Sequence, residues 1–323
     1  MAVLLALAVA AVIAAGLGAL PGSATGARAS GNAGGGPGAP GTSLAARAPG
    51  ATGPRSSPFA AAPATRRRAH HPNIVFVLTD DLSMNLLRFM PEVQALTTSG
   101  MTFENYFVSD SLCCPSRASI FTGDYPHDTG VYTNDGPQGG IGAFFSHDDE
   151  MRSFNVALQR AGYRTAMMGK YLNGYLEGPN RSPFPPSYVP SGWNEWDVAG
   201  WGYPEFDYRM NIDGHVRWFG HRGRDYLTDV IARRGVRFID RSARGHRPFF
   251  LELATFTPHS PYTPAPRDRH AFPGLTAPRP PSFDVMPTDP VSWLRGHPPL
   301  RPRQLRRINR YSPVCSPLSE LNT

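Results

Sequence analysis

The stretch of sequence that decides the fold is IVFVLTDD, residues 74–81. Its first five residues are apolar and mostly β-branched, which is typical of a β-strand. An unbroken apolar run of this length predicts a strand covered on both faces, as in a largely parallel sheet. The run leads directly to Asp80 and Asp81, so two carboxylates should lie at the carboxyl end of that strand.

Two later segments repeat this pattern of a strand that ends in a polar group. Residues 163–168 and 248–254 are predicted strands, and they lead to Lys170 and His259. Proline and glycine positions predict helices at about 91–99, 149–161 and 225–241. In open α/β sheets, ligands bind at the carboxyl ends of the strands. Each polar group alone has an ordinary structural explanation, but three strands that end this way favour an active site.

The composition restricts the class of protein. With 323 residues, 41% of them hydrophobic, and 3 cysteines, the chain is neither wholly disordered nor a disulfide-built miniprotein. The formal net charge of +7 comes from both ends, because residues 73–300 hold 24 acidic and 21 basic side chains. The compact part therefore lacks the basic surface of a nucleic-acid-binding protein, and no nucleic-acid partner is expected. Lys170 is the single lysine among the 32 Lys and Arg residues.

The two ends of the chain differ from its middle. Residues 1–29 contain an apolar run followed by small residues, which predicts a secretory signal peptide or, as the alternative, an uncleaved N-terminal anchor. Residues 30–72 are rich in Gly, Ala and Pro and are predicted to be a disordered linker. We therefore expect a secreted or cell-envelope-associated protein. Residues 311–323 form an atypical Ser- and Pro-containing tail.

The most informative motif is CCPSRASIFTG, residues 113–123. Pro115 suits the first turn of a helix and Gly123 suits its end, so Cys113 should lie just before a helix N-terminus. That position favours anions and lowers a thiol pKa. Arg117, in the same first turn, makes sense if it faces a bound anion. The residues alone predict a nucleophile beside an acidic metal site, while a small buried cysteine pair or a metal or redox pair stays open.

These residues resemble a known family. The Cys113-Cys114-Pro115-Ser116-Arg117 motif is similar to the C-x-P-S-R signature of the type I sulfatases. Residues 73–81, 169–173 and 257–261 resemble that family's opening strand with metal carboxylates, its lysine motif and its histidine motif. The resemblance extends over residues 73–310 and is strongest to the N-acetylglucosamine-6-sulfatase branch. It implies an alkaline-phosphatase-like α/β fold, with a large, mostly parallel sheet flanked by helices.

The resemblance also implies a chemistry. Cys113 would be converted to Cα-formylglycine by a formylglycine-generating enzyme, and its hydrated form would attack the sulfur of a sulfate ester. Asp80, Asp81 and residue 113 would hold one Ca²⁺, a cation that prefers oxygen ligands. Arg117 would stabilise the formylglycine. The substrate would be a sulfated carbohydrate of the glycosaminoglycan type or an aryl sulfate.

The resemblance assigns two further roles at the sulfate itself. Lys170 would bind sulfate, and His259 would bind sulfate or protonate the leaving oxygen. Many sulfatases have a histidine two residues after the lysine, but this chain has Leu172 there. Asn173 is then at best a hydrogen-bonding substitute, which makes it a weak candidate for substrate binding.

The sequence departs from the family towards its end. No Asp-Asn pair and no lysine follow His259, so two expected metal ligands and a second active-site lysine have no candidate. We therefore expect the smaller C-terminal domain of the family to be missing, and residues 73–310 to be an incomplete catalytic domain truncated near Tyr311. Two alternatives follow: a phosphonate or phosphodiester hydrolase of the same superfamily, and an inactive fragment. Residues 171–218, with four of the five tryptophans, fit a sugar-stacking loop and a packed loop equally well.

Overall fold

The computed structural model describes residues 71–178, 181–273 and 277–315. It divides the chain into two units, residues 14–71 and the remainder, and the fold below is that of the second unit. The predicted signal peptide or anchor, almost all of the predicted linker and residues 316–323 of the predicted tail lie outside the described residues. Within the described ranges, no helix is both long enough and apolar enough to cross a membrane.

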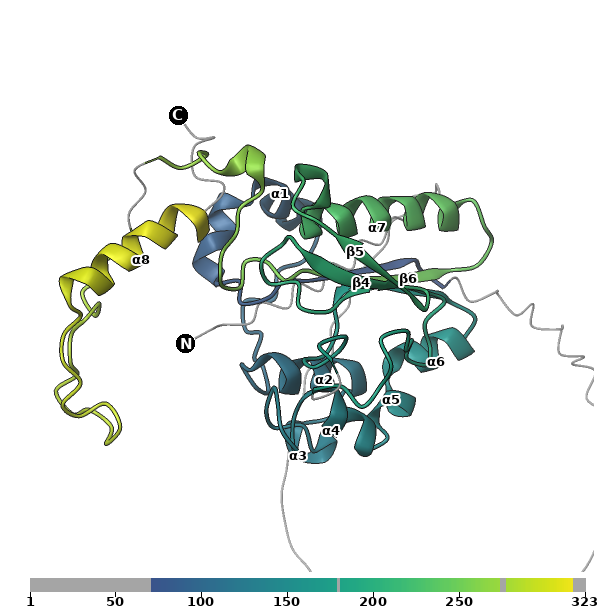
Figure 1. The fold of residues 1–323 in the computed structure, drawn as a ribbon, viewed down its shortest axis with the longest axis horizontal. Coiled ribbons are helices and arrows are strands. Elements are labelled where there is room, and N and C mark those ends of the chain that lie inside the picture. Colours follow the sequence, from purple (N-terminus) through teal and green to yellow (C-terminus); the bar gives the residue numbers. More distant parts are fainter. Residues whose placement is uncertain (1–70, 179–180, 274–276, 316–323) are drawn as a thin grey trace, which may run out of the picture. The chain divides into compact units, whose positions relative to one another are not determined.

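A six-stranded sheet forms the centre of this unit (Figure 1), with the strand order β1-β6-β2-β3-β4-β5. The strands are β1 (Ile74–Leu78), β2 (Arg164–Lys170), β3 (Glu195–Ala199), β4 (Tyr208–Ile212), β5 (His215–Phe219) and β6 (Phe249–Ala254). The first four strands in this order are parallel, and β4 and β5 continue the sheet in antiparallel fashion. The predicted α/β fold with a mostly parallel sheet is confirmed.

Helices cover both faces of the sheet (Figure 1). The helices are α1 (Pro91–Ser99), α2 (Cys113–Thr122), α3 (Pro126–Thr129), α4 (Gly140–Ser146), α5 (Asp149–Arg152), α6 (Phe154–Arg160), α7 (Leu227–Ala243) and α8 (Pro302–Cys315). Three short 3-10 helices lie at Met84–Phe89, Gly223–Asp225 and Pro266–Asp268. Met167 packs into the core shared with α2, whereas the next residue, Met168, packs into the core shared with α7. This alternation, with both side chains fully buried, is the pattern of a strand covered on both faces.

Three sequence predictions differ from the structure. β1 is only partly buried, because it lies at one end of the described sheet rather than in its middle. The helix predicted at 149–161 is two helices, α5 and α6, because Ser153 between them has extended backbone angles. The predicted tail boundary at 311 falls inside α8.

Strands β3, β4 and β5 lie in the stretch that the sequence predicts to be an irregular loop. The β4–β5 connection is Asp213-Gly214, and both residues have positive φ angles, of 47° and 86°. Such angles are those of a tight two-residue hairpin turn, for which Asp-Gly is a preferred sequence. This dipeptide was the available signal for the hairpin.

Candidate active site

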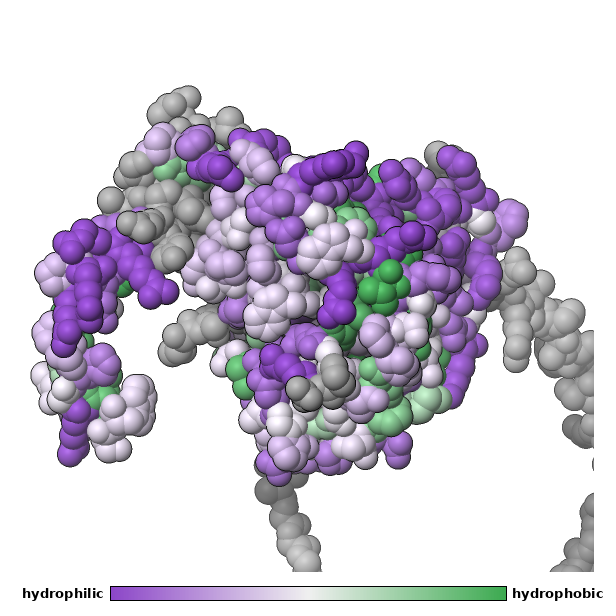
Figure 2. Space-filling view, viewed as in Figure 1, coloured by the Kyte–Doolittle hydropathy of each residue, from purple (hydrophilic) through white to green (hydrophobic). Residues whose placement is uncertain are grey.

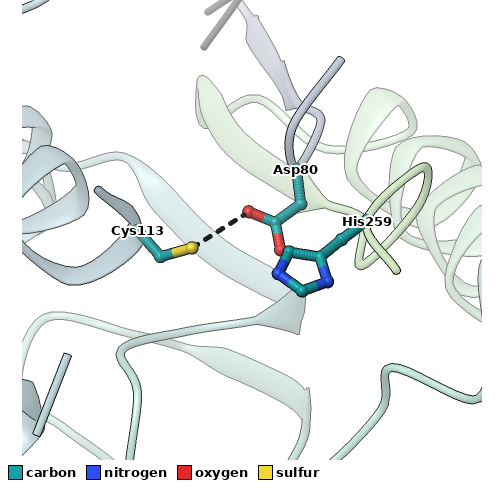
Figure 3. Close-up of side chains that lie close together, drawn as sticks. All are labelled: Asp80, Cys113 and His259. Atoms are coloured by element: carbon teal, nitrogen blue, oxygen red, sulfur yellow. Dashed lines mark hydrogen bonds between the residues drawn. The ribbon is translucent and has the colours of Figure 1, made fainter. Parts of the chain in front are cut away.

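The parallel strands bring the predicted site residues to one edge of the sheet. Asp80 follows the carboxyl end of β1, His259 follows β6, and Lys170 is the last residue of β2. Because β6 lies between β1 and β2, the three side chains come from neighbouring strands. Figure 3 shows Cys113 of α2 directed towards Asp80, with His259 beside them.

The first turn of α2 separates the two adjacent cysteines. Cys113 is the first residue of the helix, and its Sγ donates to Asp80 Oδ1 over 3.7 Å. Cys114 points into the core, where burial raises its thiol pKa to about 12. Its backbone N–H donates to Asn134 Oδ1 over 2.8 Å, so a side chain from another loop caps the helix. The structure thus makes Cys113 the cysteine that faces the polar site.

The expected low pKa of Cys113 is not found. Burial raises the pKa of this thiol above its ordinary value, and the positive charges of Lys170 and Arg117 only partly offset that effect. The position at a helix N-terminus favours a low pKa, but the thiol is buried, and burial has the larger effect. A Cys113 thiol at this site is therefore a poor nucleophile at neutral pH.

Asp80 is the centre of the charge network. Its buried carboxylate forms an ion pair with Lys170 Nζ, and Arg117 Nη2 lies 3.7 Å from Oδ1. Burial alone would raise the pKa of Asp80, but the two cations outweigh burial and hold the pKa below its ordinary value. The carboxylate is therefore ionised across the physiological pH range.

Asp81 differs from Asp80 in its exposure and in the direction of its pKa shift. It has a φ of 59°, and its carboxylate is partly exposed rather than buried. Burial and then the charge of Asp80 raise the pKa of Asp81. The Oδ2 atom of Asp81 lies 3.5 Å from His259 Nε2.

Arg117 and Lys170 are both buried cations. Arg117 donates from Nη1 to the backbone oxygen of Lys170 over 2.8 Å, which joins α2 to the end of β2. Its Nε and Nη2 atoms have no hydrogen-bond partner among the residues that the structure describes. Burial and the charge of Arg117 would lower the pKa of Lys170, but its ion pair with Asp80 raises that pKa above the ordinary value. Lys170 is therefore a buried cation that is paired with Asp80, while Arg117 still has donors that could bind an anion.

Tyr203 is a site residue that the sequence analysis missed. Its ring lies 4.8 Å from Lys170 Nζ and 4.6 Å from the ring centre of His259. Its hydroxyl accepts a hydrogen bond from Asn173 Nδ2 over 3.3 Å, which places Asn173 behind Tyr203. The sequence held no signal for Tyr203, because its position depends on the pairing of β3 with β2.

The side chains offer part of a metal site. One ligand atom each from Asp80, Cys113 and His259 lie within 4.8 Å of one another. Asp81 adds a second carboxylate beside His259. Two adjacent carboxylates, one of which has its pKa raised by burial and then by the charge of the other, fit a hard divalent cation that offsets their repulsion. The set provides fewer oxygen ligands than the six to eight that Ca²⁺ takes.

Comparison with known proteins identifies the family of this chain. A model of the family described as Sulfatase matches residues 72–282. The chain is 37% identical to human N-acetylglucosamine-6-sulfatase over 241 residues, which are 73% of this chain and 42% of that protein. It is 33% identical to the Drosophila melanogaster extracellular sulfatase SULF-1 homolog over 253 residues, which are 75% of this chain and 21% of that protein.

A solved structure of BT4656 in complex with its substrate D-glucosamine-2-N,6-O-disulfate is also similar. The TM-score is 0.51 at 26% sequence identity, and the match covers 66% of this chain and 40% of that chain. The fold is thus the alkaline-phosphatase-like fold of these proteins over part of its length. The chain spans less than half the length of each of the three proteins. The family match alone covers more than half of the chain, which therefore belongs to the sulfatase family.

Proposed function

We propose that this chain is the nucleophile-bearing part of a sulfuric ester hydrolase that acts on sulfated sugars. The observation that carries the proposal is the placement of Cys113 at the start of α2, facing Asp80, with the buried Lys170 ammonium against the same carboxylate. Such an arrangement offers a reacting group, a binding cation and a metal-type carboxylate within one edge of the sheet. The reaction would convert a sulfate ester and water to an alcohol and sulfate.

Lys170 is proposed to hold the sulfate group. Its ammonium is buried and remains charged, and a compact cation with three donors suits a tetrahedral oxyanion. Arg117 lies behind it and contributes a second fixed charge. The two cations would stabilise negative charge that develops on the sulfate oxygens.

His259 is proposed to give a proton to the leaving alcohol oxygen. Its Nδ1 lies 2.7 Å from the Ser260 carbonyl oxygen, which only accepts hydrogen bonds, so Nδ1 carries the hydrogen. Nε2 is then the nitrogen that faces Asp81 and the site, and it has a proton to give only when the ring is the doubly protonated imidazolium. The ring of Tyr203 packs against the imidazole and holds its plane.

Two groups complete the proposed chemistry. Formylglycine at position 113 would supply an oxygen nucleophile where the structure has Sγ, which accounts for a thiol whose own pKa is raised. Ca²⁺ held by Asp80, Asp81 and residue 113 would supply positive charge beside the sulfate oxygens. A formylglycine-generating enzyme is then a partner during maturation.

The substrate class and the location rest on relatives. The human protein carries the name N-acetylglucosamine-6-sulfatase, and BT4656 is described with a glucosamine disulfate as its substrate. These names support sulfated sugars of the glycosaminoglycan type, with aryl sulfates as simpler substrates. The Drosophila relative is named an extracellular sulfatase, which supports export of this chain to the cell envelope or beyond.

The test is the mass of the Cys113 peptide from the full chain produced in its own host, together with sulfate release from N-acetylglucosamine 6-sulfate. We expect formylglycine at Cys113 and sulfate release, and Cys113→Ala should abolish that release. Cys114→Ala is the matched control, because its side chain faces the core and not the site. It should keep the activity.

Three other results would contradict the proposal. Hydrolysis of aryl phosphate diesters in preference to sulfate esters would favour the phosphodiesterase alternative. An unmodified Cys113 with no hydrolysis of any ester would favour the inactive fragment. Loss of activity in Cys114→Ala but not in Cys113→Ala would mean that Cys114, and not Cys113, provides the nucleophile.

A further inference from the structure

A fourth parallel strand also ends at the edge that carries the candidate site. β3 lies beside β2, and its last residue, Ala199, is in register with Lys170. Trp201 follows two residues beyond that end, as Asp80 follows two residues beyond the end of β1. By the rule that places ligands at the carboxyl ends of parallel strands, Trp201 belongs to the same edge as the charged residues.

The contacts of Trp201 place it next to the proposed catalytic groups. Its ring centre lies 4.9 Å from that of Tyr203, in an edge-to-face arrangement. Tyr203 in turn contacts both Lys170 and His259. One aromatic side chain therefore separates Trp201 from the residues proposed to hold the sulfate and to protonate the leaving oxygen.

The backbone around Trp201 is held in place. The N–H of Gly200 donates to the oxygen of Arg209 on β4 over 3.0 Å, and the N–H of Gly202 donates to the oxygen of Gly200 over 2.9 Å. A Cβ on Gly202 would lie 2.6 Å from the ring of Phe256, so only glycine lets the loop pack this closely. Trp201 is thus presented by a fixed turn.

The four tryptophans of the 171–218 stretch divide into different environments. Trp193 and Trp196 are buried in the core shared with α2, as the packed-loop interpretation predicts. Trp201 is 55% exposed, and Trp218 is 65% exposed. Trp218 lies on β5, at the far end of the sheet from β1. Of these four, Trp201 alone combines exposure with contact to a site residue.

We propose that Trp201 is the sugar-binding wall of the active site and stacks on the pyranose ring whose sulfate Lys170 holds. This inference rests on the proposed function and specifies its substrate class, a cyclic sugar sulfate rather than an acyclic alkyl sulfate. An indole face offers a rigid apolar surface to the C–H face of a sugar ring and leaves the hydroxyl groups of the sugar in water.

The test is calorimetric titration of the full chain in a Cys113→Ala background, which removes the side chain proposed to become formylglycine. The two probes are N-acetylglucosamine 6-sulfate and inorganic sulfate. Adding Trp201→Ala should weaken binding of the sugar sulfate about tenfold and leave binding of inorganic sulfate unchanged. Trp201→Phe should retain most of the affinity. Trp218→Ala, which removes a more exposed indole away from the site, should change the binding of neither probe.

The outcomes separate this inference from the proposed function. If the parent chain binds both probes and Trp201→Ala weakens neither, the stacking role is wrong while the sulfate site stands. If Trp201→Ala weakens both probes equally, the residue supports the anion site and not the sugar. If the parent chain binds neither probe, the proposed function fails and the inference with it. A melting curve recorded by circular dichroism establishes that each variant is folded.

Discussion

Replacing Glu252 tests the electrostatics of the sheet without touching the proposed chemistry. This carboxyl group lies on β6, between β1 and β2, is fully buried, and has no hydrogen-bond partner for either oxygen within the described part of the chain. Burial raises its pKa from 4.5 to about 7, although the charge of Arg117 acts in the opposite direction. A shift of this size corresponds to about 3 kcal/mol of folding free energy.

The sign of the effect follows from which state releases the proton. Below about pH 4.5 the carboxyl is protonated in both the folded and the unfolded chain and costs nothing. As the pH rises to about 7, the unfolded chain loses the proton while the folded chain keeps it, so the free energy of unfolding falls. Above that pH the folded chain carries the full penalty. Glu252→Gln removes the ionisation and therefore this pH-dependent loss.

The assay is urea denaturation, followed by tryptophan fluorescence, between pH 4.5 and 8. The stability difference between Glu252→Gln and the parent chain should change by about 3 kcal/mol in favour of the variant as the pH rises. Glu104→Gln, the same chemical change on an exposed side chain, is the control. A variant that becomes less stable relative to the parent as the pH rises would refute the reasoning, because Glu252 would then be an ionised partner of Arg117.

Three further predictions concern packing and backbone. Gly169→Ala should destabilise the fold by at least about 3 kcal/mol, because its Cβ would overlap a backbone oxygen of β6. Gly123→Ala would meet no neighbour within 4 Å and should cost only about 1–2 kcal/mol, for its positive φ. Thermal melts of the two variants measure this difference in stability. Arg234→Ala should cost about 3 kcal/mol in urea denaturation, since it removes the Nη1 donor that contacts both carboxylate oxygens of the buried Asp197, and adding Asp197→Asn should restore part of the loss. Phe121→Ala should cost about 3–5 kcal/mol, because this ring contacts four other aromatic rings, and the same denaturation measurement checks it.

The sequence predicted those parts of the site that follow from strand ends. Asp80, Lys170 and His259 each lie at or within a few residues of the end of an apolar strand, and parallel pairing alone brings such residues together. This prediction does not depend on the order of the strands in the sheet, because the carboxyl ends of all parallel strands lie at the same edge. The choice of Cys113 over Cys114 came from the family motif, and the structure supports it by turning Cys114 into the core.

What the sequence did not predict depends on pairing and depth. Strand β3 contains Glu195 and Asp197, and two acidic residues argue against a buried strand in the sequence. They are compatible with one because they form ion pairs with Arg241 and Arg234 on α7, which the sequence does not reveal. Without β3, the position of Tyr203 beside Lys170 could not be inferred. The raised pKa of Cys113 required its burial, which local helix position does not determine.

The strand order has a consequence for how the chain folds. β6, which joins β1 to β2, is the last of the six strands to be synthesised. Asn73 Oδ1 accepts a hydrogen bond from Phe249 N across 176 residues of chain. At 5–20 residues per second, a ribosome needs roughly 9–35 s for that interval. Until then β1 lacks its neighbouring strand, so Asp80 has no sheet that fixes it beside Lys170 and Cys113. Closure of the site therefore depends on contacts between distant residues, which form slowly.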